Sequence, residues 1–399
     1  MSLRRSFTQQ INCPKDKVQK VKIIALFFLV FVVATPSASA QKKFRETKIW
    51  RYASSILNDT SEASKATFIV YPTFASSPET GLQIGASLLR LFYAKKDTLN
   101  RLSELQAFPF FTIKGQYGII FENAIYGNED KWFFLGETKI QRFPLSYYGV
   151  GPVTSGNDPA YVDAFQLLLK QRVLRKIHKN FFFGPEVDYQ LLSNVTFKQP
   201  SDGNLHEIPL GGDGTQNLGF GLGFVYDSRH NVLNVRKGLF GEIAYLTTVK
   251  GFGSEYGFGG VNLDVRSYHP VGKNSVLAWQ VKGQFMHGDV PFNQLALLGG
   301  DRLMRGYYLG RYRDKNLIAA QLEYRMLPFP FSKRFGAVAF VSAGTVAPDI
   351  NSFQIKRLRV ACGVGFRFLV FPKKDIYIRL DFGFTKEGLN FYVFNGEAF

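Results

Sequence analysis

The sequence predicts an all-β protein, a transmembrane β-barrel of 16 antiparallel strands, from three observations. The composition is rich in aromatic residues and glycine, with 40 Phe, 19 Tyr and 38 Gly among 399 residues, as expected where aromatic side chains fill pleated surfaces. Beyond residue 40, no stretch has the length of apolar sequence that a membrane-spanning helix needs. Long segments alternate apolar with polar residues instead, and this alternation continues to the end of the sequence.

The N-terminal segment has the three parts of an export signal. A basic region, residues 1–22, precedes the unbroken apolar run Ile23–Ala34 and the small residues Ala38-Ser39-Ala40. This run is 12 residues long, whereas a helix that crosses a bilayer needs ~20, which argues against a retained membrane helix. We expect residues 1–40 to be a cleaved signal peptide and residues 41–65 to be a short periplasmic segment.

The charge and the cysteines bear on partners and compartment. The formal net charge of +18 would suggest nucleic acid as a partner, but nucleic acid is the wrong partner for the compartment of an exported protein. Outer-membrane lipids and the phosphates of lipopolysaccharide are the anionic partners we expect, although basic residues also lie on surfaces that only face solvent. Cys13 falls within the expected signal peptide, so Cys362 has no partner for a disulfide.

The alternation of residue types distinguishes a membrane barrel from a soluble sandwich. In Asp375–Phe384, every second residue is apolar and the residues between are polar or small, and Arg357–Phe368 repeats the pattern. Strands of a soluble sandwich also alternate, but they commonly end near six residues. The segments here run for about 10 to 14 residues, the length of a tilted transmembrane strand with its extensions.

The alternating segments number sixteen, an even count as a closed antiparallel barrel requires. They lie near residues 67–76, 81–94, 101–114, 115–126, 131–143, 159–174, 180–195, 216–228, 238–250, 256–269, 275–288, 316–328, 335–346, 356–370, 374–386 and 389–399. We expect residues 66–399 to form one barrel domain with both ends in the periplasm. The three longest connections, 144–158, 196–215 and 289–315, would then be extracellular.

The longest connection carries the most informative motif, Gly299-Gly300-Asp301-Arg302-Leu303-Met304-Arg305-Gly306-Tyr307. At this point the chain resembles the BamA/TamA superfamily, the bacterial surface antigen barrels of the outer membrane. The resemblance implies that the extracellular loop folds into the lumen and that Arg305, Gly306 and Tyr307 are its aliphatic-Arg-Gly-aromatic motif. Met304 stands where the family usually has Val or Ile. The motif falls between the eleventh and twelfth predicted strands, where the family places it.

Further matches support the resemblance, and one departs from it. Phe340-Val341-Ser342-Ala343-Gly344 resembles the Phe-x-Asp-x-Gly of the thirteenth strand, but Ser342 replaces the acid that pairs with the loop arginine. Glu323 falls on the polar face of the twelfth strand, where the family also carries an acid, so the resemblance implies that Glu323 pairs with Arg305. A bidentate carboxylate is the partner that best satisfies a guanidinium inside a barrel.

Two more features concern the ends of the barrel. Only 25 residues separate the expected cleavage site from the first strand, too few for one of the family's periplasmic POTRA domains, so we expect a variant without them. Phe399 follows a run of aromatic residues and resembles the C-terminal signal that assembly machinery recognises on barrel clients.

Enzymatic chemistry has little support in the sequence. His287-Gly288-Asp289 is the one candidate for hydrolysis, and no serine aligns with it. The histidines are dispersed, so no metal site and no cofactor are expected. Charged residues on the predicted lumen face have mixed signs, which indicates a polar network before an ion filter. They are Arg266, Lys282, Arg325, Arg367 and Arg379 with Asp227, Glu242, Asp264, Glu323 and Asp381.

The resemblance implies a protein that helps to insert or export a protein or lipid client, aided by periplasmic accessory proteins and located in the bacterial outer membrane. Pairing between the first and last strands would be weak, and the strand edge left open would serve as a template for a client strand. The alternative is a passive channel or structural barrel plugged by loop 289–315, with Arg305 only holding the plug in place.

Overall fold

The computed structural model describes residues 67–97, 99–200, 205–229, 234–372 and 375–399. The expected signal peptide, residues 1–40, and the expected periplasmic segment, residues 41–65, lie outside the described residues and stay predictions.

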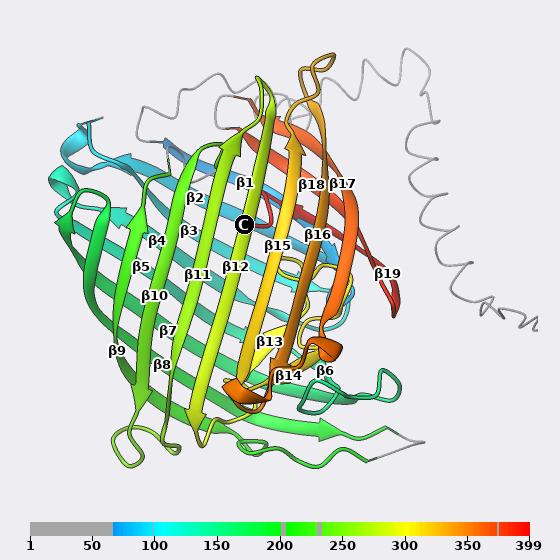
Figure 1. Cartoon of the computed structure of the whole chain (residues 1–399). Coiled ribbons are helices and arrows are strands. Elements are labelled where there is room, and N and C mark those ends of the chain that lie inside the picture. Colours follow the sequence, from blue (N-terminus) through cyan, green and yellow to red (C-terminus); the bar gives the residue numbers. More distant parts are fainter. Residues whose placement is uncertain (1–66, 98, 201–204, 230–233, 373–374) are drawn as a thin grey trace, which may run out of the picture. The chain divides into compact units, whose positions relative to one another are not determined.

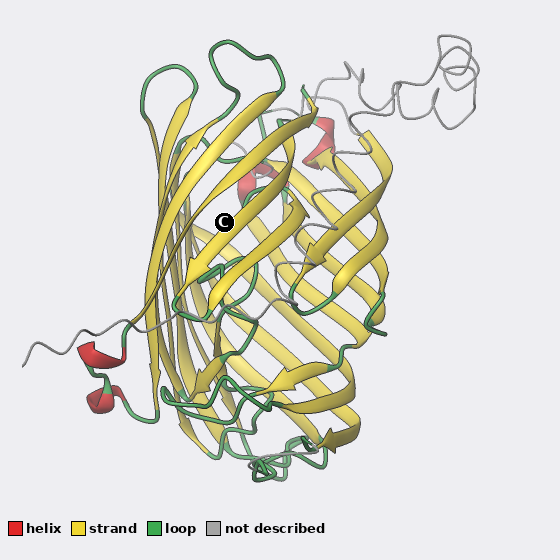
Figure 2. Ribbon diagram, turned by 90° about the vertical axis from the view of Figure 1, so that its right-hand side faces the viewer, coloured by secondary structure: helices red, strands yellow, loops and turns green. Residues whose placement is uncertain are grey.

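The described chain forms one closed antiparallel barrel (Figure 1), in which each strand pairs with the next. Its strands are β1 (Thr67–Ser77), β2 (Gly81–Tyr93), β3 (Leu102–Thr112), β4 (Tyr117–Tyr126), β5 (Trp132–Arg142), β6 (Leu145–Tyr147), β7 (Ala160–His178), β8 (Phe181–Lys198), β9 (Thr215–Asp227), β10 (Gly238–Thr248), β11 (Phe258–Pro270), β12 (Ser275–Gly288), β15 (Asn316–Met326), β16 (Phe335–Ala347), β17 (Arg359–Phe371), β18 (Ile376–Thr385) and β19 (Gly388–Asn395). β6 continues β5 along the same partner, β7, beyond Pro144, which has no N–H to donate. Counted as one, they give the 16 barrel strands that the sequence predicts. The tilted strands cross the wall obliquely in Figure 2.

The predicted boundaries hold to within a few residues, with one instructive exception. The last strand ends at Asn395, whereas the alternation predicts that it continues to Phe399. Gly396 has a φ of 79°, a left-handed conformation that ends the extended strand. The prediction of strand 389–399 was therefore wrong in its last four residues.

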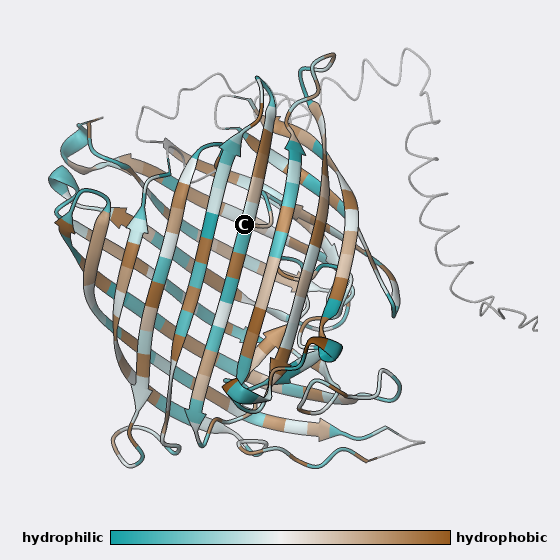
Figure 3. Ribbon diagram, in the orientation of Figure 1, coloured by the Kyte–Doolittle hydropathy of each residue, from teal (hydrophilic) through white to brown (hydrophobic). Residues whose placement is uncertain are grey.

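The two faces of the sheet differ as the alternation requires. On β15, Leu322 and Tyr324 are exposed on one face, whereas Gln321, Glu323 and Arg325 are buried on the other. The same alternation of apolar and polar residues is visible along the strands in Figure 3. Within the described residues, no helix is long and apolar enough to span a membrane. Because the charged face is buried, its side chains need partners inside the protein.

The seam between the first and last strands is the least paired junction of the sheet. β1 pairs with β2 along all 11 of its residues. Its pairing with β19 consists of the single register pair Ser76 and Val393. In the described barrel, closure by backbone pairing therefore depends on one residue pair.

Candidate functional site

The loop between β12 and β15 is built on a short hairpin of its own. Its strands are β13 (Ala296–Leu298) and β14 (Tyr312–Asp314), which pair in a separate two-stranded sheet. The hairpin also bonds to the connection after β6, where the N–H of Gly151 donates to the carbonyl of Arg313 at 2.8 Å. These contacts hold both ends of the segment 299–311, which carries the motif.

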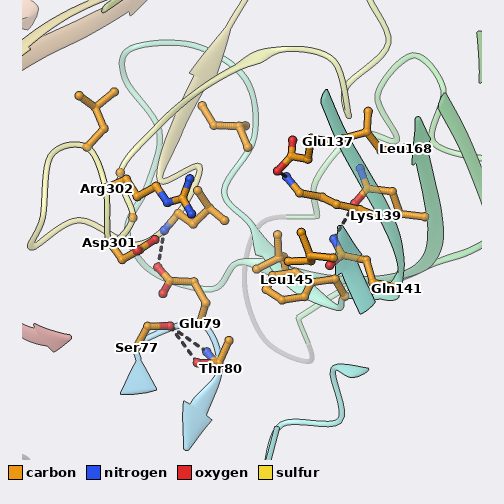
Figure 4. A pocket seen from close by; sticks show the side chains of 18 of the residues that line it. Ser77, Glu79, Thr80, Glu137, Lys139, Gln141, Leu145, Leu168, Asp301 and Arg302 are labelled. Atoms are coloured by element: carbon orange, nitrogen blue, oxygen red, sulfur yellow. Dashed lines mark hydrogen bonds and ion pairs between the residues drawn. The ribbon is translucent and has the colours of Figure 1, made fainter. Parts of the chain in front are cut away.

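Part of this segment lines a cavity of about 780 Å³. Residues 299–303 form one side, and polar side chains from β1, β2, β3, β5, β7, β8 and β12 form the others. Figure 4 shows Arg302 reaching into the cavity from the loop, with Glu137, Lys139 and Gln141 lining it from β5. Arg302 keeps 74% of its side chain exposed and has Glu122 as an ion-pair partner at 3.9 Å. The lining of this cavity carries charges of both signs.

Arg305 lies in the opposite environment, with a fully buried side chain. Its guanidinium forms ion pairs with Glu323 on β15 and with Asp381 on β18, the latter at 2.6 Å. The guanidinium carbon also lies 3.7 Å from the ring centroid of Phe340 on β16. Burial opposes the charge, but the two carboxylates outweigh it and raise the pKa of Arg305 above its usual value. Arg305 is therefore a permanent cation that ties the loop to three strands.

The structure brings Arg305 and Glu323 together and leaves Ser342 apart from them. The hydroxyl of Ser342 donates to the carbonyl of Ala361 at 3.4 Å instead. Asp381, two strands further along the sheet than Ser342, supplies the second carboxylate. The sequence placed Asp381 on the lumen face, but the alternation gave no sign that it would reach Arg305.

Arg305 belongs to a larger cluster in which positive and negative charges balance. The guanidinium groups are those of Arg305, Arg325, Arg367 and Arg379, and the carboxylates are those of Glu323, Asp381, Glu397 and Asp301. Asp381 alone pairs with Arg367 at 2.5 Å and with Arg379 at 3.1 Å. Each carboxylate of the cluster serves at least one arginine, so removing one leaves a buried cation short of a partner.

The backbone of the motif lies directly on β18. Gly306 has a φ of 116°, and a Cβ atom at Gly383 would lie 2.5 Å from the carbonyl oxygen of Arg305. On β19, the Tyr392 hydroxyl accepts from the N–H of Gly306 at 3.0 Å and donates to the carbonyl of Tyr307 at 3.1 Å. The Asn390 amide donates to the carbonyl of Gly306 at 2.6 Å. The loop is thus bound to the last two strands. The sequence did not predict that Gly383, Asn390 and Tyr392 would contact it.

The aromatic member of the motif and Gly344 fix the hairpin. Tyr307 packs in a buried cluster with Leu298, Met304 and Tyr312, and its hydroxyl donates to a carbonyl of β17 at 3.3 Å. A Cβ atom at Gly344 would lie 3.1 Å from the side chain of Leu298. The absence of a side chain at Gly344 therefore lets β13 approach β16 closely.

The loop also contacts the turn between β1 and β2. The N–H of Leu309 donates to the carboxylate of Glu79 at 2.6 Å. Burial raises the pKa of Glu79, although hydrogen bonds from Ser77 and Leu309 oppose this effect. Together with Asn390 and Tyr392, this contact means that one loop binds elements on both sides of the seam.

The remaining candidates lie elsewhere. Phe399 packs against Tyr268 and Arg325 instead of extending the last strand, and its role as an assembly signal stays a prediction. The ring of His287 lies 3.3 Å from the Tyr245 hydroxyl, with no serine at hydrogen-bond distance in the described chain. Among the described residues, no group of three His, Cys, Asp or Glu side chains could hold a metal ion.

Comparison with known proteins identifies relatives of this barrel. The Omp85 superfamily domain matches residues 146–392, more than half of the chain. A structure of BamA from Haemophilus ducreyi lacking POTRA domains 1–3 superposes with a TM-score of 0.53 at 15% identity, covering 83% of this chain and 70% of that chain. CdiB from Acinetobacter baumannii superposes with a TM-score of 0.50 at 13% identity, covering 82% of this chain and 59% of that chain. CdiB from Escherichia coli superposes with a TM-score of 0.53 at 11% identity, covering 81% of this chain and 62% of that chain. No match was found among curated protein sequences. At these identities the structures show a shared fold.

Replacing Asp381 tests the charge balance of the cluster. We expect Asp381→Asn to destabilise the barrel by about 3–5 kcal/mol, because three buried guanidinium groups lose a partner. Unfolding by denaturant in detergent micelles measures the effect. Asp264→Asn is the control, because its partner Arg266 is partly exposed, and we expect a smaller loss. Equal losses in the two variants would contradict the proposed balance.

Replacing Gly383 tests the seating of the loop. In Gly383→Ala the new methyl group overlaps the backbone of Arg305 and Gly306, so the loop must move, at a cost of about 1–3 kcal/mol. Limited proteolysis should then cleave the loop faster. Gly241→Ala on β10 is the matched control, since the nearest atom to its Cβ is 3.8 Å away. A loop that stays equally resistant in both variants would show that β18 does not seat it.

Proposed function

We propose a transport or assembly role for this barrel, starting from the premise that the chain belongs to the Omp85 superfamily. Membership confirms the resemblance drawn from the loop motif, and it makes this barrel a bacterial outer-membrane protein. BamA and CdiB share its fold. The finer proposal is that the barrel assists the insertion or export of a protein or lipid client.

The single observation that carries the proposal is the seam. In the described sheet, β1 and β19 share one register pair, so a backbone ladder hardly joins their facing edges. Such an edge can pair with the backbone of an incoming strand, which is the physical basis of β-augmentation. All other neighbouring barrel strands pair at eight or more positions in the described sheet, so they offer no comparable edge.

The loop supplies what the ladder lacks. We infer that segment 299–311 occupies the barrel interior and spans the seam from within, because it binds Glu79 beside β1 and Asn390 and Tyr392 on β19. Opening the seam for a client then requires the side-chain contacts to the loop to change. Breaking the backbone hydrogen bonds of the seam itself needs little free energy, because there are so few of them.

We also propose the surroundings in which this happens. The apolar outer face, including Phe220, Leu222 and Phe224 on β9, contacts the lipid chains of the membrane. Basic residues of the connecting loops meet the phosphates of lipopolysaccharide at the rim. Protein clients, and periplasmic accessory proteins that deliver them, complete the proposed set of partners. We propose no enzymatic activity.

A disulfide across the seam tests the transport role. Ser76→Cys with Val393→Cys, in a Cys362→Ala background, joins the one register pair of the seam. In the organism depleted of the native protein, we expect other outer-membrane proteins to fall in abundance. The locked variant should restore them only after reduction. Quantitative proteomics of the outer membrane measures the outcome and identifies the clients.

The matched control places a disulfide between Ala343→Cys and Val360→Cys. These residues are a register pair of β16 and β17, which pair along their length, away from the seam. This variant should restore the proteome whether oxidised or reduced. An unchanged outer-membrane proteome after depletion would contradict the transport role and favour a channel or a structural barrel.

The cavity supports a second candidate function, a passive channel plugged by loop 289–315. Its walls carry Glu137 and Lys139 on one side and Arg302 on the other. A solute path through this space would be restricted by the loop.

Removing the anchor of the loop tests this alternative. If the barrel is a plugged channel, Arg305→Ala should raise single-channel conductance in planar bilayers, because the loop loses both buried ion pairs. Arg175→Ala removes the same charge from an exposed position near Trp132 and should leave conductance unchanged. No rise in Arg305→Ala would exclude the loop as the plug.

A further inference from the structure

The four residues after β19, here named the latch segment (396–399), fold away from the sheet. The chain turns at Gly396, whose N–H donates to the carbonyl of Tyr377 at 2.7 Å. Figures 1 and 2, viewed from perpendicular directions, both place the end of the described chain within the outline of the barrel. The latch segment therefore lies inside, at the end of the strand that forms the seam.

A built pocket holds the ring of Phe399. The ring packs with the buried cluster Val235, Tyr268, Val276 and Ala278, which comes from the connection before β10 and from β11 and β12. The guanidinium carbon of Arg325 lies 4.8 Å from the ring centroid, and its Nη2 donates to the carbonyl oxygen of Phe399 at 3.0 Å. The pocket thus combines an apolar wall with a cation over the ring.

A second subsite binds the side chain of Glu397. Both carboxylate oxygens accept from the Nε of Arg367, at 3.0 Å and 2.9 Å, and both side chains are almost fully buried. The latch segment thus presents two recognition elements, a carboxylate and an aromatic ring two residues later, each to its own buried arginine.

The same two arginines belong to the cluster around Arg305. Arg325 also pairs with Glu323 at 2.7 Å, and Arg367 also pairs with Asp381 at 2.5 Å. Glu323 and Asp381 are the two carboxylates that hold Arg305. The latch segment is therefore linked to Arg305 by two routes, one through Arg325 and Glu323 and the other through Arg367 and Asp381.

The pocket has capacity beyond its present occupant. In the described structure, Nη1 of Arg325, Nη2 of Arg367 and the hydroxyl of Tyr268 are buried without a hydrogen-bond partner. Departure of Glu397 would also leave four guanidinium groups facing three carboxylates. A vacated pocket would therefore favour any peptide that restores both the carboxylate and the ring.

We propose that this pocket is a peptide-binding site for a short segment with a carboxylate and an aromatic side chain two residues apart, occupied in this state by the chain's own latch segment. Release of the latch segment weakens the cluster that holds Arg305, so occupancy of the pocket controls how firmly the loop is seated. The inference stands on the pocket alone and holds whether the barrel transports a client or conducts a solute.

Binding of a synthetic peptide to a variant without residues 396–399 tests the proposal. The probe is the peptide Asn-Gly-Glu-Ala-Phe with a fluorophore at its N-terminus, and anisotropy in detergent micelles reports binding. We expect saturable binding to the shortened variant, weaker by about tenfold for the unshortened chain, whose own segment competes. Peptides with Glu→Gln or Phe→Ala should bind at least about tenfold more weakly than the parent peptide.

Variants of the pocket wall separate recognition from folding. Ala278→Phe in the shortened variant fills the apolar pocket and should abolish binding. Arg175→Ala changes an exposed residue near Trp132, outside the pocket, and should leave binding unchanged. If the shortened variant fails to fold, Phe399→Ala in the unshortened chain replaces it, because it loosens the segment without deleting it. No saturable binding to any folded variant, or binding that ignores both peptide substitutions, would overturn the proposal.

Protease sensitivity of the loop tests the link to Arg305. Removal of residues 396–399 should speed cleavage within segment 299–311, and added peptide should slow it again at the concentration that saturates anisotropy. Peptide binding without any change in loop cleavage would leave the pocket in place but disprove its control over the loop.

Discussion

The buried guanidinium of Arg305 is the constraint on which the arrangement of this barrel depends. A cation removed from water inside a protein costs several kcal/mol unless carboxylates and hydrogen bonds surround it. The loop that carries Arg305 cannot supply them, so they come from the wall: Glu323 on β15 and Asp381 on β18, with the ring of Phe340 between. Meeting this requirement fixes the height and the side of the barrel at which the loop lies. The approach of Gly306 to Gly383 follows from that position.

We propose that the loop helps to keep closed a barrel with so little pairing at its seam. Backbone ladders between other neighbours form and break cooperatively, because each pair positions the next. At the seam, contacts from Glu79, Asn390 and Tyr392 to the loop take over much of that work. These contacts are separate from one another and can be exchanged one at a time. A seam held in this way can open without disturbing β15 to β18, whose ladders are long.

The sequence was sufficient to predict the strands, their number and the face on which each side chain lies, because a period of two residues encodes all three. It also identified Arg305, Gly306, Tyr307 and Glu323 as neighbours through a motif. It could not reveal Asp381, Gly383 or Tyr392 as partners of the loop. Alternation states that a residue faces inward, but contacts between a loop and distant strands depend on the tilt and stagger of the closed barrel. The end of β19 was missed for a local reason, since Gly396 adopts a conformation that the alternation does not encode.

The interior is consequently divided into two regions with different physical properties. Near β15 to β19, Arg305 and most of the cluster around it are buried, and the four cations and four anions of the cluster are paired. Toward β2 to β8, the cavity is lined by Glu137 and Lys139, which keep about a third of their side chains exposed. A solute would cross the cavity, whereas a client strand would enter at the seam beside the buried cluster. The two candidate functions meet at Asp301, Arg379 and Glu397, which belong to the cluster and also line the cavity. A change that loosens Arg305 therefore reaches the cavity through these cluster residues as well as through Arg302 on the same loop.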